Sequence, residues 1–230
     1  MREIFQQSVY FGVVLSLGSY AVGMFLKRKT GWAIMNPLLV SIVICIVFLA
    51  VTGTSYSDYN KGAEWLSYLM TPATVCLAVP LYQQVELLRK NSRAIIVGIT
   101  SGVLASLTSI LLMALAFGWD HTSFVTFLPK SITTAIGISL SAELGGMVPV
   151  TVVAIAVTGV FGSVVAESFL KLLRIKEPVA KGIALGSASH VIGTARAMEM
   201  GAIEGATSGL SIVVSGIMTV VLSSLFAMLL

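Results

Sequence analysis

The length of the charge-free apolar stretches constrains this chain more than any other feature. Six stretches contain no Asp, Glu, Lys, Arg or His, at residues 4–26, 30–57, 65–85, 94–119, 144–166 and 205–230. Each reaches the roughly 20 residues that an α-helix needs to cross the hydrocarbon core of a bilayer. Only 10% of the 230 residues are charged, against about 25% in soluble domains. The sequence therefore predicts an all-α polytopic membrane protein with about six transmembrane helices.

Two further apolar segments, 131–142 and 182–195, are too short to cross a bilayer as single helices. Charged residues bound each segment on both sides. Such a segment either dips into the bilayer as a re-entrant half-helix or crosses by including its polar flanks. The distribution of basic residues distinguishes these two alternatives.

The basic residues favour the re-entrant alternative. With six crossings, one side of the membrane receives ten of them: Lys27, Arg28, Lys29, Arg89, Lys90, Arg93, Lys171, Arg174, Lys176 and Lys181. The other side receives only Arg2, Lys61 and Lys130. Because cytoplasmic loops are enriched in lysine and arginine, the larger group is expected inside the cell and both termini outside. The first dip then enters from the outside and the second from the cytoplasm.

The two short segments also resemble each other. Aligned at an offset of 56, residues 131–146 and 187–202 share five identities: Ser131 with Ser187, Ile136 with Ile192, Gly137 with Gly193, Glu143 with Glu199, and Gly145 with Gly201. After one inserted residue, VTGV at 157–160 aligns with VSGI at 214–217. Because the copies are expected to enter from opposite faces, the duplication predicts an inverted repeat of broken half-helices. Transporters place binding sites between such repeats, near the membrane midplane.

Three motifs resemble the LrgB/CidB family of bacterial antiholin-like or holin-like membrane proteins. They are PATVCLAVPLYQQ at 72–84, ITTAIGISLSAELGG at 132–146 and GSASHVIGTARAMEMGAIEGATSGLS at 186–211. The family also includes the carboxyl half of the plastid glycolate/glycerate transporter. The resemblance runs from about residue 36 to the end and departs at Ala135, where such proteins usually have proline.

The resemblance implies one LrgB-type transmembrane domain over residues 1–230. Within it, the N-terminal helices are expected at 4–118, the first repeat copy at 131–173 and the second at 182–230. The bilayer to which this domain belongs is expected to be the bacterial cytoplasmic membrane, which the chain would cross several times.

The resemblance also implies two functions. One is transport of small monocarboxylates such as pyruvate, glycolate or glycerate, by a transporter or transport subunit. The alternative is antiholin- or holin-like regulation of murein hydrolase activity and lysis, with an LrgA/CidA-type small membrane protein as partner. Transport is favoured here, because a pore of oligomerised short helices needs no duplicated half-helices with charged residues. A homodimer is expected, since six crossings make a small body, and the apolar segment 37–51 is a plausible contact surface.

Arg196 is the first candidate for binding a substrate. A guanidinium has five donors and can hold a carboxylate with two parallel hydrogen bonds, and an ionisable residue inside a membrane is usually functional. The alternative is an internal ion pair, because Glu199 lies three residues further along the same helical face. One arginine can serve both purposes, so both interpretations stand.

The second group of candidates is ionisable. His190 either relays a proton or donates a hydrogen bond to a nearby carbonyl while neutral. Glu143 and Glu199 occupy equivalent positions in the two copies. They pair with cations, accept protons or close each dip by hydrogen bonding to backbone amides.

The third group consists of hydroxyl residues in the two dips: Ser131, Thr133, Thr134, Ser187, Ser189 and Thr194. Their hydroxyl groups either bind substrate oxygens or bond to the preceding helical turn, as is common in membrane helices. Catalysis, metal binding and a cofactor are not expected, because His121 and His190, with no cysteine beside either, do not make a metal site or a nucleophile and base pair. Nucleic acid is not an expected partner either, since the basic residues lie at helix ends.

Overall fold

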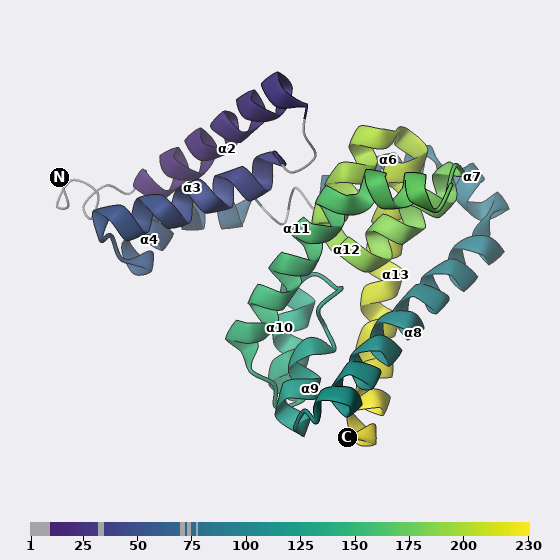
Figure 1. The fold of residues 1–230 in the computed structure, drawn as a ribbon. Helices are drawn as coiled ribbons and strands as arrows, with labels where there is room; N and C mark the ends of the chain where they lie inside the picture. Colours follow the sequence, from purple (N-terminus) through teal and green to yellow (C-terminus); the bar gives the residue numbers. More distant parts are fainter. Residues whose placement is uncertain (1–9, 32–34, 70–71, 73–74, 77) are drawn as a thin grey trace. The chain divides into compact units, whose positions relative to one another are not determined.

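The computed structural model describes residues 10–31, 35–69, 72, 75–76 and 78–230. Most of these residues are helical, and no strand occurs among them. The all-α prediction is therefore confirmed over the described residues (Figure 1). The chain divides into two compact units, Met1–Cys76 and Leu77–Leu230.

The described part of the first unit contains the helices α2 (Phe11–Thr30), α3 (Pro37–Thr52) and α4 (Tyr56–Tyr68). Asn36 begins α3 because its side-chain oxygen accepts hydrogen bonds from the first turn, and Ser55 does the same for α4. α2 packs against both other helices. Hydroxyl groups meet inside this packing, where Ser19 Oγ lies 2.8 Å from Ser41 Oγ.

Three helices among the described residues are long and apolar enough to cross a membrane: Ser92–Phe117, Val148–Leu172 and Ala202–Leu229. The first two are α8 and α11, and the third comprises α13 (Ala202–Phe226) and a final 3₁₀ turn, η1 (Ala227–Leu229). They coincide with three of the six predicted stretches. In the second unit, helices of membrane-spanning length and apolarity therefore occur at three of the places that charge-free length predicted.

The other three predicted stretches give a less regular result. The stretches 4–26 and 30–57 contain α2 and α3, and α3 has only 16 residues. The stretch 65–85 contains the end of α4, α6 (Ala78–Gln83) and the first residue of α7 (Val85–Lys90), not one continuous helix. Parts of these stretches, at 4–9, 32–34, 70–71, 73–74 and 77, lie outside the described residues. The count of six crossings stays a prediction.

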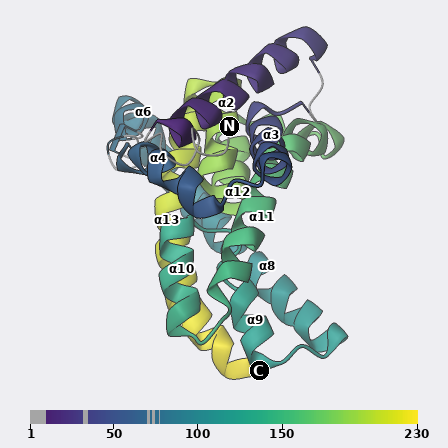
Figure 2. The same cartoon turned by 90° about the vertical axis from the view of Figure 1, so that its left-hand side faces the viewer.

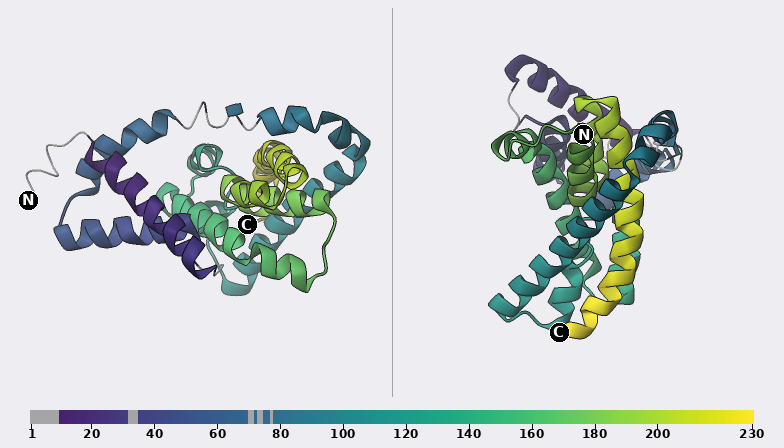
Figure 3. Two further views of the ribbon diagram at one scale, coloured as in Figure 1. Left: turned by 90° about the horizontal axis from the view of Figure 1, so that it is seen from above. Right: turned by 90° about the vertical axis from the view of Figure 1, so that its right-hand side faces the viewer.

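α8 supplies much of the core of the second unit. Its buried residues recur every three or four positions and form one face: Ile95, Ile99, Val103, Leu107, Ile110 and Ala114. This spacing places them on a single helical stripe. The stripe packs with Phe124 and Leu128 and with partly buried residues of α13 such as Leu210 and Met218. α8 and α13 are in contact and cross at an angle, as Figure 3 (right) shows in teal and yellow.

The first short segment, 131–142, lies between α8 and α11 and contains most of α10 (Thr134–Glu143), and α9 (His121–Phe127) precedes it. Asp120 begins α9 by accepting a hydrogen bond from the Ser123 N–H at 3.2 Å. Near the end of α9, Thr126 Oγ1 accepts a hydrogen bond from the Met147 N–H at 2.8 Å. This hydrogen bond therefore holds the two ends of the segment 126–147 together. Figure 2 shows α9 at the same end of the unit as the C-terminus.

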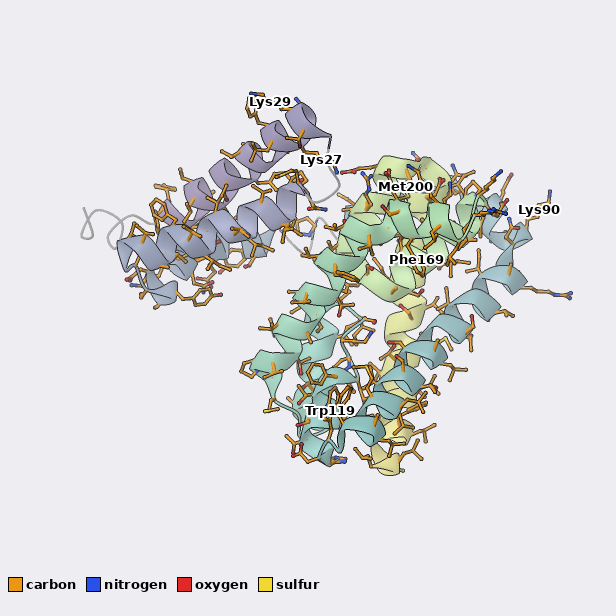
Figure 4. The ribbon with its side chains drawn as sticks, in the orientation of Figure 1. Lys27, Lys29, Lys90, Trp119, Phe169 and Met200 are labelled. Carbon is orange, nitrogen blue, oxygen red and sulfur yellow. The ribbon has the colours of Figure 1, made fainter. Side chains whose placement is uncertain are left out.

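The second short segment is α12 (Pro178–Met200), which is folded back on itself. Its backbone leaves the helical conformation at Ser189 and His190, where φ of His190 is 42°. Lys181 from its start and Met200 from its end line one common hollow. Figure 4 shows Met200 and Lys90 at one end of the unit and Trp119 at the other. The chain thus enters and leaves on one side, which agrees with a re-entrant dip at 182–195.

The two segments that align in sequence pack crosswise, each against the long helix that follows the other. A Cβ on Gly159 of α11 would lie 2.9 Å from Cδ1 of Ile192, and one on Gly216 of α13 would lie 3.3 Å from Cδ1 of Ile136. Ile136 and Ile192 are equivalent in the two aligned copies, and so are Gly159 and Gly216. Each short segment therefore contacts the long helix that follows the other copy, and the glycines permit this close approach.

Candidate functional site

A cavity of about 460 Å³ lies in the second unit between α8, α11, α12 and the loop before α10. Its polar lining consists of Ser106, Ser109, Lys130, Ser131, Thr158, Ser187 and Ser189. Ser131 comes from the loop of the first short segment, and Ser189 comes from the break in α12. The irregular parts of both short segments therefore meet at one polar cavity, where such backbone is tolerated inside a membrane.

Lys130 is the one charged side chain among the described residues that line this cavity. It is half-buried, and its Nζ donates to Ser131 Oγ at 3.0 Å and to Ser106 Oγ at 3.4 Å. These two hydroxyl oxygens lie 3.3 Å apart. Among the residues that the structure describes, no carboxylate forms an ion pair with Lys130. The cavity thus holds an ammonium with hydroxyl partners but without a balancing negative charge.

Three of the predicted hydroxyl residues line the cavity, namely Ser131, Ser187 and Ser189. Ser187 Oγ donates to Ile183 O at 2.6 Å, within its own helix, as membrane helices commonly allow. Ser189 is buried against Gly162 of α11, where a Cβ would lie 1.8 Å from Ser189 Oγ. The repeat relates Ser131 to Ser187, so equivalent residues of the two copies face one cavity.

The other predicted hydroxyl residues are not among those that line the cavity. Thr133 precedes the first turn of α10, which begins at Thr134. Thr194 is buried and donates to His190 O at 3.0 Å, while its Oγ1 lies 2.7 Å from Ser208 Oγ. Thr194 therefore holds the second half of α12 against α13. Its environment matches the structural interpretation of these hydroxyl groups.

His190 is buried at the break in α12, with Nε2 3.0 Å from Ile155 O of α11. A neutral imidazole that donates to this carbonyl fits the distance. This hydrogen bond corresponds to the second interpretation of His190, in which the neutral ring donates to a nearby carbonyl. It attaches the turn of the folded-back α12 to α11. The ring is not among the groups that line the cavity.

Arg196 forms ion pairs with two carboxylates. One nitrogen, NH2, contacts Glu167 Oε1 of α11 at 2.5 Å, and NH1 contacts Glu199 Oε2. The Arg196 side chain is 17% exposed, whereas Glu167 and Glu199 are 44% and 60% exposed. Arg196 is absent from the described lining of the cavity. The structure therefore brings Arg196 together with Glu199, as the ion-pair alternative predicted, and adds Glu167 from another helix.

Glu143 and Glu199 occupy similar places in their copies. Glu143 is the last residue of α10, and Glu199 lies one residue before the end of α12. Both are exposed. The two glutamates that align in sequence therefore lie at corresponding helix ends, and neither lines the cavity.

Lys130 is the site residue that the sequence interpretation missed, since it counted Lys130 only as a charge outside the membrane. One signal in the sequence marks it. Lys130 is the only lysine or arginine between Arg93 and Lys171, and it immediately precedes Ser131, where the first repeat begins. A basic residue that is isolated in this way next to a broken half-helix is a candidate for binding an anion.

The rest of the cavity wall is apolar and includes Phe161, Val165, Phe169, Leu170 and Leu185. Phe169 is labelled in Figure 4, on α11. An ammonium with two hydroxyl groups at one place and aliphatic and aromatic groups elsewhere suits a small amphipathic anion. The site can bind such an anion and orient it.

Three apolar helices of membrane-spanning length among the described residues, two of which line a cavity with the two short segments, define a polytopic membrane protein. The sequence model of the LrgB-like family matches residues 16–229. The chain therefore belongs to the LrgB-like family, which confirms the resemblance carried by its motifs.

Two relatives illustrate the similarity. The protein named antiholin-like protein LrgB of Bacillus subtilis (strain 168) is 38% identical over 223 residues, which cover 96% of each chain. The protein of the same name from Bacillus mycoides (strain KBAB4) is 38% identical over 218 residues, 94% of this chain and 95% of its own. The comparison with solved structures finds no match.

Proposed function

We propose that this chain acts as an antiholin-like protein in the bacterial cytoplasmic membrane, where it lowers murein hydrolase activity and restrains lysis. The observation that carries this proposal is the 38% identity to antiholin-like protein LrgB over 96% of both chains. Similarity across nearly the whole length supports a shared role, because no part of the relative is left without a counterpart. An LrgA/CidA-type small membrane protein is the proposed partner.

A complementation experiment tests this role. The chain is expressed in a Bacillus subtilis strain that lacks its own antiholin-like protein LrgB, with and without an LrgA-type partner. Detergent-induced autolysis and murein hydrolase activity of extracts are then measured. The expected result is slower autolysis when the chain is present in the membrane fraction. An unchanged autolysis rate in both backgrounds, with the chain present in membranes, would contradict the proposal.

Transport of small monocarboxylates is a second candidate function, favoured by one observation of its own. The loop of the first short segment and the break of the second line one cavity that contains the Lys130 ammonium. Transporters with inverted repeats bind substrates between broken helices. The crosswise packing of Gly159 on Ile192 and Gly216 on Ile136 supports such a repeat. Pyruvate, glycolate and glycerate are the proposed substrates.

Uptake into proteoliposomes tests the second candidate. Radiolabelled pyruvate and glycolate are offered to vesicles that contain the chain alone or with an LrgA-type partner, across pH gradients of both directions. The expected result is uptake that unlabelled pyruvate competes away. Failure under every condition would leave the antiholin-like role as the remaining proposal.

A further inference from the structure

The structure assigns Lys130 as the group that binds the carboxylate of a small monoanion in the cavity. This inference deepens the transport candidate and rests on it for the choice of ligand. The sequence suggested Arg196 for binding the anion, whereas this inference gives that role to Lys130, which directly precedes the first repeat copy. Three observations support it. No carboxylate among the described residues balances the charge of Lys130, hydrogen-bond donors converge near its ammonium, and Arg196 already forms two ion pairs.

The charge balance comes first. Lys130 is half-buried, and no carboxylate among the described residues pairs with it. An uncompensated ammonium in a largely apolar wall is unfavourable unless a ligand supplies the opposite charge. A carboxylate that enters the cavity would supply this charge.

The donors also converge. Lys130 Nζ directs two of its three N–H bonds to Ser131 Oγ and Ser106 Oγ. Both hydroxyl groups accept from the ammonium, and one of them donates its O–H to the other at 3.3 Å. The third N–H and the remaining O–H together offer two donors at one place. A carboxylate accepts several hydrogen bonds on its two oxygens and matches this set.

Arg196 is not available for the same purpose. Its guanidinium contacts Glu167 of α11 and Glu199 of its own helix, and it is not among the residues that line the cavity. Binding a substrate carboxylate there would require one of these ion pairs to break. Lys130 requires no such exchange.

The lining also limits the class of anion. Phe161, Val165 and Phe169 form part of the wall, and Lys130 is the one cation among the described lining residues. A second carboxylate on the ligand would lie against these side chains without a partner, which is costly. The site therefore favours a monoanion with a short uncharged body over a dianion of similar size.

A binding experiment with purified protein in nanodiscs tests this assignment. Labelled pyruvate is the probe, and methyl pyruvate and malonate are the neutral and dianionic competitors. The Lys130→Met variant should bind pyruvate about 30-fold more weakly, since a charge-assisted hydrogen bond is lost. The matched control is Lys90→Met, at the exposed end of α7, which should bind like the wild type. Both competitors should displace pyruvate poorly.

Thermal unfolding of the ligand-free variants provides the second measurement. Lys130→Met should unfold at the same temperature as the wild type or higher, because an unbalanced ammonium has been removed. If Lys130 serves only to hold Ser106 and Ser131 together, Lys130→Met should unfold at a lower temperature and its affinity for pyruvate should stay unchanged. Lys130→Gln keeps a hydrogen-bond donor and provides a second folded variant for the same comparison.

The outcomes separate the inference from the function on which it rests. Lys130-dependent binding without uptake into vesicles would support the assignment and contradict transport. Binding that persists in Lys130→Met would overturn the assignment, and uptake that persists in this variant would also leave transport in place. Absence of pyruvate binding by the folded wild type would overturn both.

Discussion

At the scale of single residues, Arg196 is a link between helices. Its NH2 contacts Glu167 of α11 and its NH1 contacts Glu199 within α12. Because Arg196 is the least exposed of the three side chains, loss of its carboxylates leaves a poorly solvated charge. Glu167 provides the connection between the helices, whereas Glu199 is a local pair at a spacing of three residues.

We expect Arg196→Met to lower the free energy of unfolding by about 2 kcal/mol, because two carboxylates lose their partner. Glu199→Gln should cost only about 0.5 kcal/mol, since its side chain is largely exposed. Glu167→Gln should cost more than Glu199→Gln, because it breaks the contact with α11. Thermal unfolding in mild detergent measures each variant.

The combined change tests the interpretation of Arg196 as a structural residue. Arg196→Met with Glu167→Gln and Glu199→Gln should be more stable than Arg196→Met alone, because the two carboxylates that lose Arg196 are removed with it. Lys171, 80% exposed, loses only a 3.9 Å contact with Glu167. If this triple variant also takes up pyruvate normally, Arg196 has no part in the site. Loss of uptake by a stable triple variant would return Arg196 to it.

The residues of the site could be predicted in part. The alignment related Ser131 to Ser187, and both line the cavity, while the spacing of Arg196 and Glu199 indicated the ion pair that they form. The contact of Arg196 with Glu167 joins residues 29 positions apart on different helices, so helical spacing alone gave no sign of it. A single lysine beside an apolar run usually marks a helix end, which concealed the role of Lys130.

At the scale of elements, the break in α12 depends on a close contact with α11. Gly162 faces Ser189 at a distance that leaves no room for a side chain, because a Cβ on Gly162 would lie 1.8 Å from Ser189 Oγ. The hairpin can therefore approach α11 only where α11 carries a glycine. Gly162 also lines the cavity, so this contact sets the position of the cavity wall.

The variant Gly162→Ala should lower the free energy of unfolding by about 1–3 kcal/mol, since added volume in a packed contact forces side chains to move. Gly18→Ala in α2 is the matched control, because no atom lies within 4 Å of its added Cβ. It should be neutral or stabilising by up to about 1 kcal/mol. Adding Ser189→Ala to Gly162→Ala should recover part of the loss. Equal stability of both glycine variants would show that the contact is not close.

The long helices could be predicted from the sequence, whereas the position of the break in α12 could not. Charge-free runs of sufficient length located α8, α11 and α13, because bilayer thickness sets their minimum length. The repeat and the basic residues predicted that 182–195 would turn back. The position of the turn, at Ser189 and His190, depends on tertiary contacts with Gly162 and Ile155 O. These contacts come from α11 and leave no periodic signal in α12.

At the scale of the whole molecule, the arrangement in the membrane stays a prediction, based on the ten basic residues that six crossings would place on one side. Single cysteines at Lys61 and Asp120 should react with an impermeant thiol reagent added outside intact cells, and cysteines at Lys90 and Lys176 should not. Permeabilised cells provide the control, since all four positions should then react. Labelling of Lys176→Cys from outside would contradict the inverted repeat.

We also expect the molecule to form a homodimer through α3. This helix presents exposed apolar side chains, including Ile42, Val43, Ile46 and Val47, in a segment with a Ser41 but no charged residue. Exposed apolar side chains of α3 can contact either lipid or a second copy of the chain, and the mass of the complex distinguishes these two cases. Native mass spectrometry in mild detergent should give twice the chain mass of 24.2 kDa, and Val47→Cys should form a disulfide-linked dimer. A monomeric mass together with no cross-link would contradict this prediction.

The folded-back shape of α12 has a consequence for biosynthesis. Each half of this hairpin is shorter than the roughly 20 apolar residues by which the insertion machinery recognises a spanning helix. Its polar turn bonds to groups of α11 and α13, such as Ile155 O and, through Thr194, Ser208. We therefore expect the hairpin to enter the bilayer after both neighbours are in place. A nascent chain that is released before α13 has been synthesised would leave α12 in the aqueous phase, where proteases that clear incomplete membrane proteins can reach it.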